Sequence, residues 1–128
     1  MTKTIAIIDD DLDFLEWLKI GLKMEEYNVI TATTGKDGLN LVRDNKIDLI
    51  ILDIILTDIN GFDIIKKLKA GISTSKIPVI AVTGFYKEAE YVQKGYETGV
   101  DDFLLKPFSY ELLSVKIKKI LGALVTNE

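Results

Sequence analysis

Acidic residues follow two apolar segments of this chain of 128 residues. Asp9, Asp10 and Asp11 come directly after the run IAII, and Asp53 comes directly after DLIIL. Carboxylates that lie within a few ångströms of one another repel, and a divalent cation relieves that repulsion. The chain has no Cys and no His, so the ligands must be oxygen atoms, which suit Mg²⁺ or Mn²⁺. Such an ion keeps room for a phosphate oxygen, so the pattern indicates phosphate chemistry.

Two further polar residues stand directly after strand-like segments. Thr83 follows VIAV, and Lys106 follows DFLL. A carboxylate such as Asp53 can accept a phosphoryl group and form an acyl phosphate. Lys106 would balance the added charge, and the Thr83 hydroxyl would bind a phosphoryl oxygen. Each residue alone also fits a structural role, as a helix cap, a turn residue or a solvated charge. Asp11 is expected to cap a helix, which leaves Asp9 and Asp10 without a local structural purpose.

Five strand-sized apolar segments alternate with five segments of helical spacing. The expected strands are 4–8, 28–32, 47–52, 78–82 and 102–105, and the expected helices are 12–24, 35–43, 62–70, 87–98 and 110–122. Three of these strands are apolar on both sides, as in a parallel sheet buried between two helical layers. The alternation predicts an α/β fold, (βα)5, with a doubly wound parallel five-stranded sheet. Gly35 and Gly38 weaken the second helix, which is therefore expected to be short.

The carboxyl ends of the strands are the expected position of a site, because ligands of open parallel sheets bind where the strand order reverses. If the order is 2-1-3-4-5, strands one and three flank that reversal. Asp9, Asp10 and Asp53 then meet in one pocket, and Thr83 and Lys106 approach from one side.

The composition is that of one globular domain, with 48% hydrophobic and 28% charged residues. A net charge of −4 has the wrong sign for a protein that binds nucleic acid directly. No apolar run approaches the ~18 residues of a membrane span, and no secretory signal is seen. We therefore expect a cytoplasmic protein that binds neither membrane nor nucleic acid. The domain is expected over residues 1–122, with 123–128 as a C-terminal tail.

Four motifs resemble the receiver domain of two-component response regulators, the chemotaxis-regulator-like family. They are IAIIDDD, DLIILDIILTDINGFD, IPVIAVTG and GVDDFLLKPF, and the resemblance covers essentially the whole chain. It implies a flavodoxin-like fold with the strand order 2-1-3-4-5. It also implies that Asp53 is the phosphoacceptor and that Asp9 and Asp10 organise Mg²⁺, with Asp10 as the direct ligand. The backbone carbonyl of Ile55 is implied as a further metal ligand.

The resemblance assigns switch and support roles to other positions. Thr83 matches the switch hydroxyl, and Lys106 matches the lysine of the family pattern, followed by a cis peptide bond to Pro107. Phe103 matches the aromatic switch position, which is often Tyr, and its ring could rotate inwards once Thr83 moves. A purely structural core aromatic is the alternative. Thr57 stands where the family commonly has Pro, which predicts a more mobile loop.

The implied function is a switch that takes a phosphoryl group from a phospho-His of a histidine kinase or His-phosphotransfer protein. The domain would catalyse its own phosphorylation and dephosphorylation and would not be a metabolic enzyme. Its fourth helix, fifth strand and fifth helix would bind a downstream effector, and a homodimer is possible. Phe14 and Trp17 are candidates for partner docking, or else they simply cover the edge of the sheet.

Two alternatives belong to other classes. A pseudo-receiver would serve only as an interaction module and is expected to lack the phosphoacceptor or the lysine, both of which this chain has. A flavodoxin-like mononucleotide-binding protein is disfavoured, because Asp9, Asp10 and Asp11 would repel its phosphate.

Overall fold

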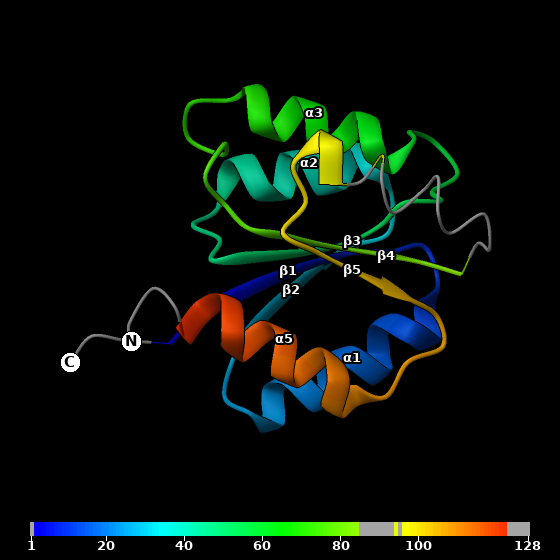
Figure 1. Ribbon diagram of the computed structural model, residues 1–128, viewed down its shortest axis with the longest axis vertical. Coiled ribbons are helices and arrows are strands. Elements are labelled where there is room, and N and C mark those ends of the chain that lie inside the picture. The colour runs from blue at the N-terminus through cyan, green and yellow to red at the C-terminus, as the bar shows by residue number, and fades with distance from the viewer. Residues whose placement is uncertain (1, 85–93, 95, 123–128) are drawn as a thin grey trace.

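Five parallel strands form one sheet between two layers of helices (Figure 1). The computed structural model describes residues 2–84, 94 and 96–122. The spatial order is β2-β1-β3-β4-β5, which confirms the predicted doubly wound sheet. The strands are β1 (Thr4–Ile8), β2 (Asn28–Ala32), β3 (Leu49–Asp53), β4 (Val79–Thr83) and β5 (Asp102–Leu105).

Four helices of the described part of the chain cover the two faces of the sheet in pairs. They are α1 (Leu12–Met24), α2 (Gly35–Asp44), α3 (Gly61–Ala70) and α5 (Tyr110–Gly122). α1 and α5 cover one face, and α2 and α3 cover the other (Figure 1). The helix expected over 87–98 and the tail expected over 123–128 fall largely or wholly outside the described residues. Within the described part of the chain, no helix has the length and apolar character needed to cross a membrane.

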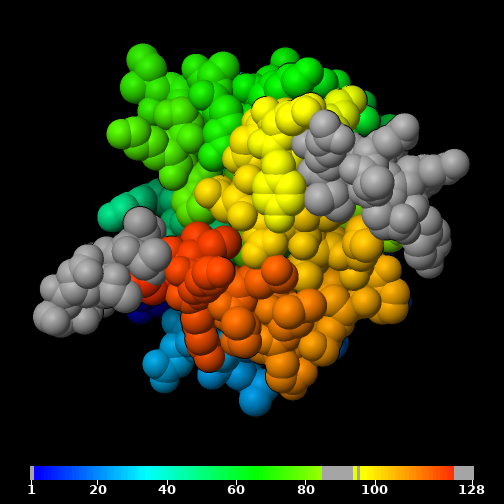
Figure 2. All heavy atoms as spheres, viewed as in Figure 1, coloured from blue at the N-terminus to red at the C-terminus, as the bar shows by residue number. Residues whose placement is uncertain are grey.

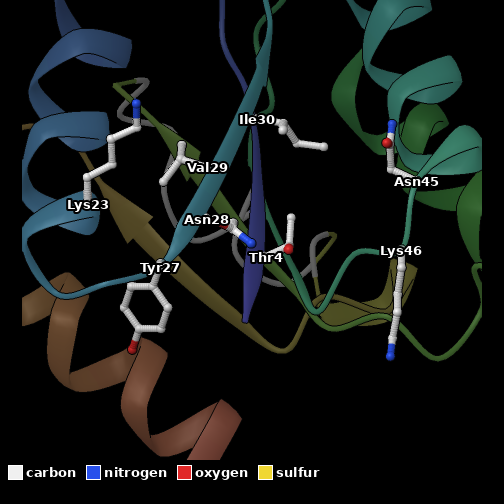
Figure 3. A pocket seen from close by; sticks show the side chains of 8 residues that line it. All are labelled: Thr4, Lys23, Tyr27, Asn28, Val29, Ile30, Asn45 and Lys46. Carbon is white, nitrogen blue, oxygen red and sulfur yellow. The ribbon is translucent and has the colours of Figure 1, made fainter. Parts of the chain in front are cut away.

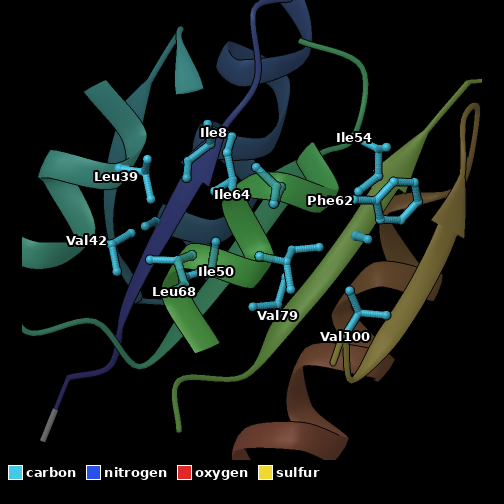
Figure 4. Close-up of a cluster of buried hydrophobic side chains, with 14 of the residues drawn as sticks. Ile8, Leu39, Val42, Ile50, Ile54, Phe62, Ile64, Leu68, Val79 and Val100 are labelled. Carbon is cyan, nitrogen blue, oxygen red and sulfur yellow. The ribbon is translucent and has the colours of Figure 1, made fainter. Parts of the chain in front are cut away.

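Successive residues of the central strands point into opposite cores, which explains why these strands are apolar on both sides. In β1, Ile5 and Ile7 pack with α1 and α5, whereas Ala6 and Ile8 pack with α2 and α3. All four side chains are fully buried. Figure 4 shows the second of these cores, where Ile8 and Ile64 lie close to one another between the sheet and the helices. A sheet clamped in this way holds its strand ends in fixed positions.

Three helices begin at a capping side chain, and one of these is the predicted cap Asp11. Asp11, Thr34 and Ser109 each accept a hydrogen bond of 3.1 Å from the backbone N–H three residues further along. Such bonds satisfy one of the free N–H groups in the first turn of a helix. The helices α1, α2 and α5 therefore begin where the local sequence predicts.

Two strands lie one or two residues later than expected. β3 begins at Leu49, not at residue 47, and Asp48 just before it accepts the Thr4 N–H on its Oδ2 at 2.8 Å. β4 ends at Thr83, whose carbonyl oxygen accepts the Lys106 N–H at 2.8 Å. Each shift extends a strand by one residue at its carboxyl end. Asp53 and Thr83 are consequently strand residues and share the rigidity of the sheet.

Gly38 has a packing role that the local helix propensity did not reveal. A Cβ at this position would lie 2.7 Å from Cδ1 of Ile8, so only glycine lets α2 approach β1 this closely. α2 nevertheless spans ten residues and is shorter than α1 and α5, which have thirteen each. The cost in helix propensity is offset by close packing on the sheet.

Gly61 is expected to be essential for the turn that follows β3. A Cβ there would lie 2.5 Å from Cα of Ile54 and 2.9 Å from the carbonyl oxygen of Asp53, and these backbone atoms cannot move aside. Gly61→Ala should lower the free energy of unfolding by about 1–3 kcal/mol, measured by urea denaturation. Gly122→Ala is the matched control, because no atom lies within 4 Å of a Cβ at that position. An equal loss of stability in both variants would contradict the steric explanation.

Candidate functional site

Three carboxylates meet at the carboxyl ends of β1 and β3. One oxygen from each of Asp9, Asp10 and Asp53 lies within 4.8 Å of the others. Asp9 is 1% exposed and Asp53 is 8% exposed, whereas Asp10 is exposed to solvent. β1 and β3 are neighbours in the sheet although they are far apart in the chain, and this neighbourhood brings the acidic ends together. The predicted convergence of the acidic residues is therefore present.

Asp9 has a local role that the sequence prediction missed. Its Oδ1 accepts the backbone N–H of Asp11 at 2.9 Å, and its Oδ2 accepts a hydrogen bond from Lys106 Nζ at 2.9 Å. The expectation that Asp9 serves no local structural purpose was wrong, because the tight turn after β1 aims the Asp11 N–H back at this side chain. The bond leaves Asp9 with a fixed orientation at the rim of the pocket.

Lys106 supplies the positive charge of the pocket. Its Nζ lies 2.9 Å from Asp9 Oδ2 and 3.5 Å from Asp53 Oδ2, so one ammonium contacts both buried carboxylates. The lysine is not the isolated solvated charge of the structural alternative, since its side chain is only 20% exposed. The peptide bond from Lys106 to Pro107 is cis, as the resemblance implies.

The electrostatics of the pocket favour the arrival of more positive charge. Burial and the neighbouring Asp9 carboxylate raise the pKa of Asp53 from 3.8 to about 6, against the opposing effects of the Ile55 N–H and Lys106. Burial lowers the pKa of Lys106, but the hydrogen bond to Asp9 and the charges of both carboxylates outweigh it and raise the pKa. One lysine therefore neutralises the acidic cluster only in part.

The donor set fits a hard divalent cation. Asp9, Asp10 and Asp53 offer only oxygen atoms, and the exposure of Asp10 opens the cluster to solvent on one side. Mg²⁺ is held in proteins by a small number of carboxylates and keeps several waters, and Mn²⁺ accepts the same ligands. The acidic group is thus a candidate Mg²⁺ site with room for a ligand from outside the protein.

The loop after β3 is tied to neighbouring elements. The Ile55 N–H donates to Asp53 Oδ1 at 3.0 Å, which orients the carboxylate and places Ile55 beside the pocket. Asp58 accepts the backbone N–H groups of Gly35 at 2.8 Å and Lys36 at 3.0 Å, at the start of α2. The prediction of a mobile loop considered only that Thr57 replaces a proline, and it did not include these hydrogen bonds. Asp58 was not singled out in the sequence, because its partners are more than twenty residues away.

Thr83 and Phe103 are both buried below the pocket. Thr83 is fully buried at the end of β4, which pairs with β3 on one side and β5 on the other. The Phe103 ring is 9% exposed and belongs to the core with Ile54 and Phe62. The ring thus already lies inwards, and a phenyl group has no hydroxyl that would draw it towards water.

Four aromatic residues pack together beside Lys106. Phe14 and Trp17 on α1 contact Phe108, and Trp17 also contacts Tyr110, with ring centroids 5.8–6.2 Å apart. Phe14 also lies under the Lys106 ammonium, 4.0 Å from ring centroid to Nζ. The prediction that Phe14 and Trp17 face a partner or cover the sheet did not include this contact with the site.

Two hollows of the described part of the chain lie away from the acidic cluster. One of about 560 Å³ lies along β2 near the amino ends of the strands, between Lys23 and Lys46 (Figure 3). Another of about 500 Å³ lies between α1 and α5, beside Met24 and Val115. The acidic site is by contrast a shallow cluster at the opposite, carboxyl end of the sheet. Its chemistry, and not its volume, makes it the candidate site.

The chain is an α/β protein with a doubly wound parallel sheet, and its carboxylates and lysine lie at the point of strand reversal, where such sheets bind ligands. The family model described as the response regulator receiver domain matches residues 5–118. The chain therefore belongs to the response regulator receiver domain family of two-component systems.

Individual relatives agree with this assignment. The chain is 32% identical over 118 residues to the transcriptional regulatory protein AfsQ1 of Streptomyces coelicolor, covering 92% of this chain and 51% of that protein. It is 37% identical over 117 residues to the response regulator ArlR of Staphylococcus aureus, covering 91% and 52%. A two-component response regulator structure from Clostridium difficile superposes with a TM-score of 0.90 at 31% identity, covering 96% and 98%. The chain spans about half the length of these curated relatives.

The raised pKa of Asp53 predicts how stability depends on pH when no metal is bound. The folded state binds the Asp53 proton more tightly than the unfolded chain, so the stability contributed by this proton is full below pH 3.8 and is lost as the pH rises to about 6. Asp53→Asn should therefore stabilise the protein by about 2–3 kcal/mol near pH ~7.5 and by little near pH ~4.5. Thermal unfolding with a chelator present measures both values.

Asp44→Asn is the control for this measurement, because Asp44 is exposed at the end of α2. Its effect should be small at both pH values. If the gain from Asp53→Asn is the same at both pH values, the pKa of Asp53 is not raised in the folded protein.

Proposed function

We propose that this domain is a phosphorylation-dependent switch whose acceptor is Asp53. The observation that carries the proposal is the position of Asp53, buried beside Asp9 and Asp10 with Lys106 Nζ 3.5 Å from its Oδ2. An oxygen of Asp53 would attack the phosphorus of a phospho-His on a histidine kinase or His-phosphotransfer protein. An O–P bond forms, the N–P bond breaks, and the imidazole nitrogen keeps the electron pair and takes up a proton.

The residues around Asp53 would each support this transfer. The Ile55 N–H holds Oδ1, which leaves Oδ2 as the oxygen that faces Lys106 and attacks. Carboxylates of Asp9, Asp10 and Asp53, with the carbonyl of Ile55, would hold Mg²⁺, or Mn²⁺ in its place. The ion, when bound, neutralises charge on the phosphoryl oxygens. Lys106 is already inside the pocket and would follow the new negative charge.

A switching surface is the second part of the proposal. Phosphorylation would draw the Thr83 hydroxyl to the phosphoryl group, and Phe103 would adjust in the space beside it. Phe103 lies on β5, whose first residue, Asp102, accepts both hydrogen bonds of the Lys116 ammonium on α5 at 3.0 and 2.9 Å. Figure 2 shows α5, in orange to red, and the segment that leads into β5, in yellow, side by side on one face. With the fourth helix, this surface would bind an effector or a second copy of the chain.

Family membership indicates the partners of the proposed switch. Response regulators work with a sensor kinase and a downstream effector, and those partners are expected for this domain too. We place the exchange in the cytoplasm, and we expect neither nucleic acid nor membrane to contact this domain directly. The functional domain is proposed to span residues 1–122. The alternative of a phosphorylation-independent pseudo-receiver shares the fold and differs only in the chemistry at Asp53.

The direct test is phosphorylation by a small donor. Purified domain with Mg²⁺ and acetyl phosphate should gain one phosphoryl group on Asp53, detected by intact mass and peptide mapping. Asp53→Asn should abolish the gain, and Asp63→Asn, an exposed acidic residue on α3, should not. Lys106→Ala should keep Mg²⁺ binding and label at least about tenfold more slowly, since it loses a charge-assisted contact. Mg²⁺ binding without any labelling, even with kinases as donors, would support the pseudo-receiver.

The role of Phe103 can be tested separately from the chemistry. Phe103→Leu keeps an apolar side chain in the core and should leave labelling of Asp53 intact, at a cost in stability of about 1 kcal/mol. In the wild type, beryllofluoride should shift amide resonances in the pocket, in β5 and in α5. In the variant those shifts should remain in the pocket and shrink in β5 and α5. Equal shifts in both proteins would remove Phe103 from the switch.

A further inference from the structure

Among the residues that the structure describes, the Lys106 ammonium contacts two carboxylates and one aromatic ring. Asp9 Oδ2 and Asp53 Oδ2 lie 2.9 and 3.5 Å from Nζ, and the centroid of the Phe14 ring lies 4.0 Å from it. A cation over the face of an aromatic ring is attracted by the negative face of the π-system, well within the usual limit of about 6 Å. The ring therefore supplies an attractive contact on a side where the pocket has no carboxylate.

The position of the Phe14 ring is set by other aromatic residues. Phe108 meets it edge to face at 5.8 Å with an interplanar angle of 87°, and Trp17 lies 5.9 Å away. Trp17 also contacts Phe108 at 5.9 Å, so these three rings form a closed triangle. Phe14 and Trp17 belong to α1, which is fixed by its Asp11 cap, and Phe108 follows the cis peptide bond of Pro107. The ring is consequently held in place before any ligand arrives.

The two carboxylates attract Lys106 less strongly when they also bind a cation. When a cation draws on the oxygens of Asp9 and Asp53, the ammonium loses part of the attraction that keeps it in the pocket. Lysine has a long flexible side chain and a strongly hydrated head, so water competes for it. The Phe14 ring offers no metal ligand, so a cation that draws on the carboxylates does not compete for its contact with the ammonium.

We propose that Phe14 is a positioning residue for Lys106, whose ring holds the ammonium beside Asp53 by a cation–π contact. This inference rests on the proposed phosphoryl transfer for its functional consequence, but the contact itself belongs to the metal-free protein. Removal of the aromatic face should let the ammonium turn to solvent and should slow transfer to Asp53. The affinity for Mg²⁺ should be unchanged, because Phe14 offers no ligand.

The test compares Phe14→Leu, which keeps an apolar side chain, with Phe14→Tyr, which keeps the aromatic face. The first readout is the NMR shift of the Lys106 ε-methylene group in metal-free protein, because the ring current of Phe14 moves this signal upfield. The upfield shift should be lost in Phe14→Leu and kept in Phe14→Tyr. The second readout is the rate of labelling by acetyl phosphate at saturating Mg²⁺, which should fall about two- to thirtyfold in Phe14→Leu only.

The controls separate the contact from folding and from the proposed function. Ile20→Ala changes an exposed apolar residue of α1 and should alter neither readout. If Phe14→Leu does not fold, Phe14→Met replaces it as the non-aromatic variant. An unchanged ε-methylene shift in the non-aromatic variant, or equal labelling rates in the Leu and Tyr variants, would overturn the inference. If wild-type protein is labelled neither by acetyl phosphate nor by kinases, the proposed function fails, and the NMR shift alone decides whether Phe14 holds Lys106.

Discussion

The repulsion between the buried carboxylates of Asp9 and Asp53 is the constraint on which the site depends. Both groups are almost completely removed from water, and a single ammonium, that of Lys106, lies between them. Burial of Asp53 and the charge of the neighbouring Asp9 carboxylate together raise the pKa of Asp53. The acidic cluster therefore attracts a cation, and the proposed phosphoryl acceptor is one of its members.

The rest of the fold holds these charges in place. Each central strand is packed on both faces, and Asp53 and Thr83 are the last residues of their strands. The side chains of the site thus extend from a sheet packed on both faces, and the loop after β3 is tied back by hydrogen bonds. Asp58 fastens the loop after β3 to α2, and Gly61 lets that loop fold against the backbone of Ile54.

The segment from Lys106 to Tyr110 joins the pocket to two other regions. Lys106 contacts the carboxylates, Phe108 packs with the aromatic residues of α1, and Tyr110 begins α5. Tyr110 also donates a hydrogen bond of 2.6 Å to Glu25 at the end of α1. These contacts connect the acidic pocket with the contact between α1 and α5 through side chains that touch one another.

The sequence by itself determined the elements and the chemical residues. Helices and strands follow from apolar spacing and from caps such as Asp11, which act within a few residues, and the polar ends of the strands were visible as motifs. The strand order came from family resemblance, because spacing alone does not say which strands are neighbours. Only the tertiary structure decided that Asp9 bonds to Lys106, that Phe103 is already buried and that Phe14 lies under the ammonium. These contacts join residues distant in the chain, and their energies depend on burial and distance, which local sequence does not encode.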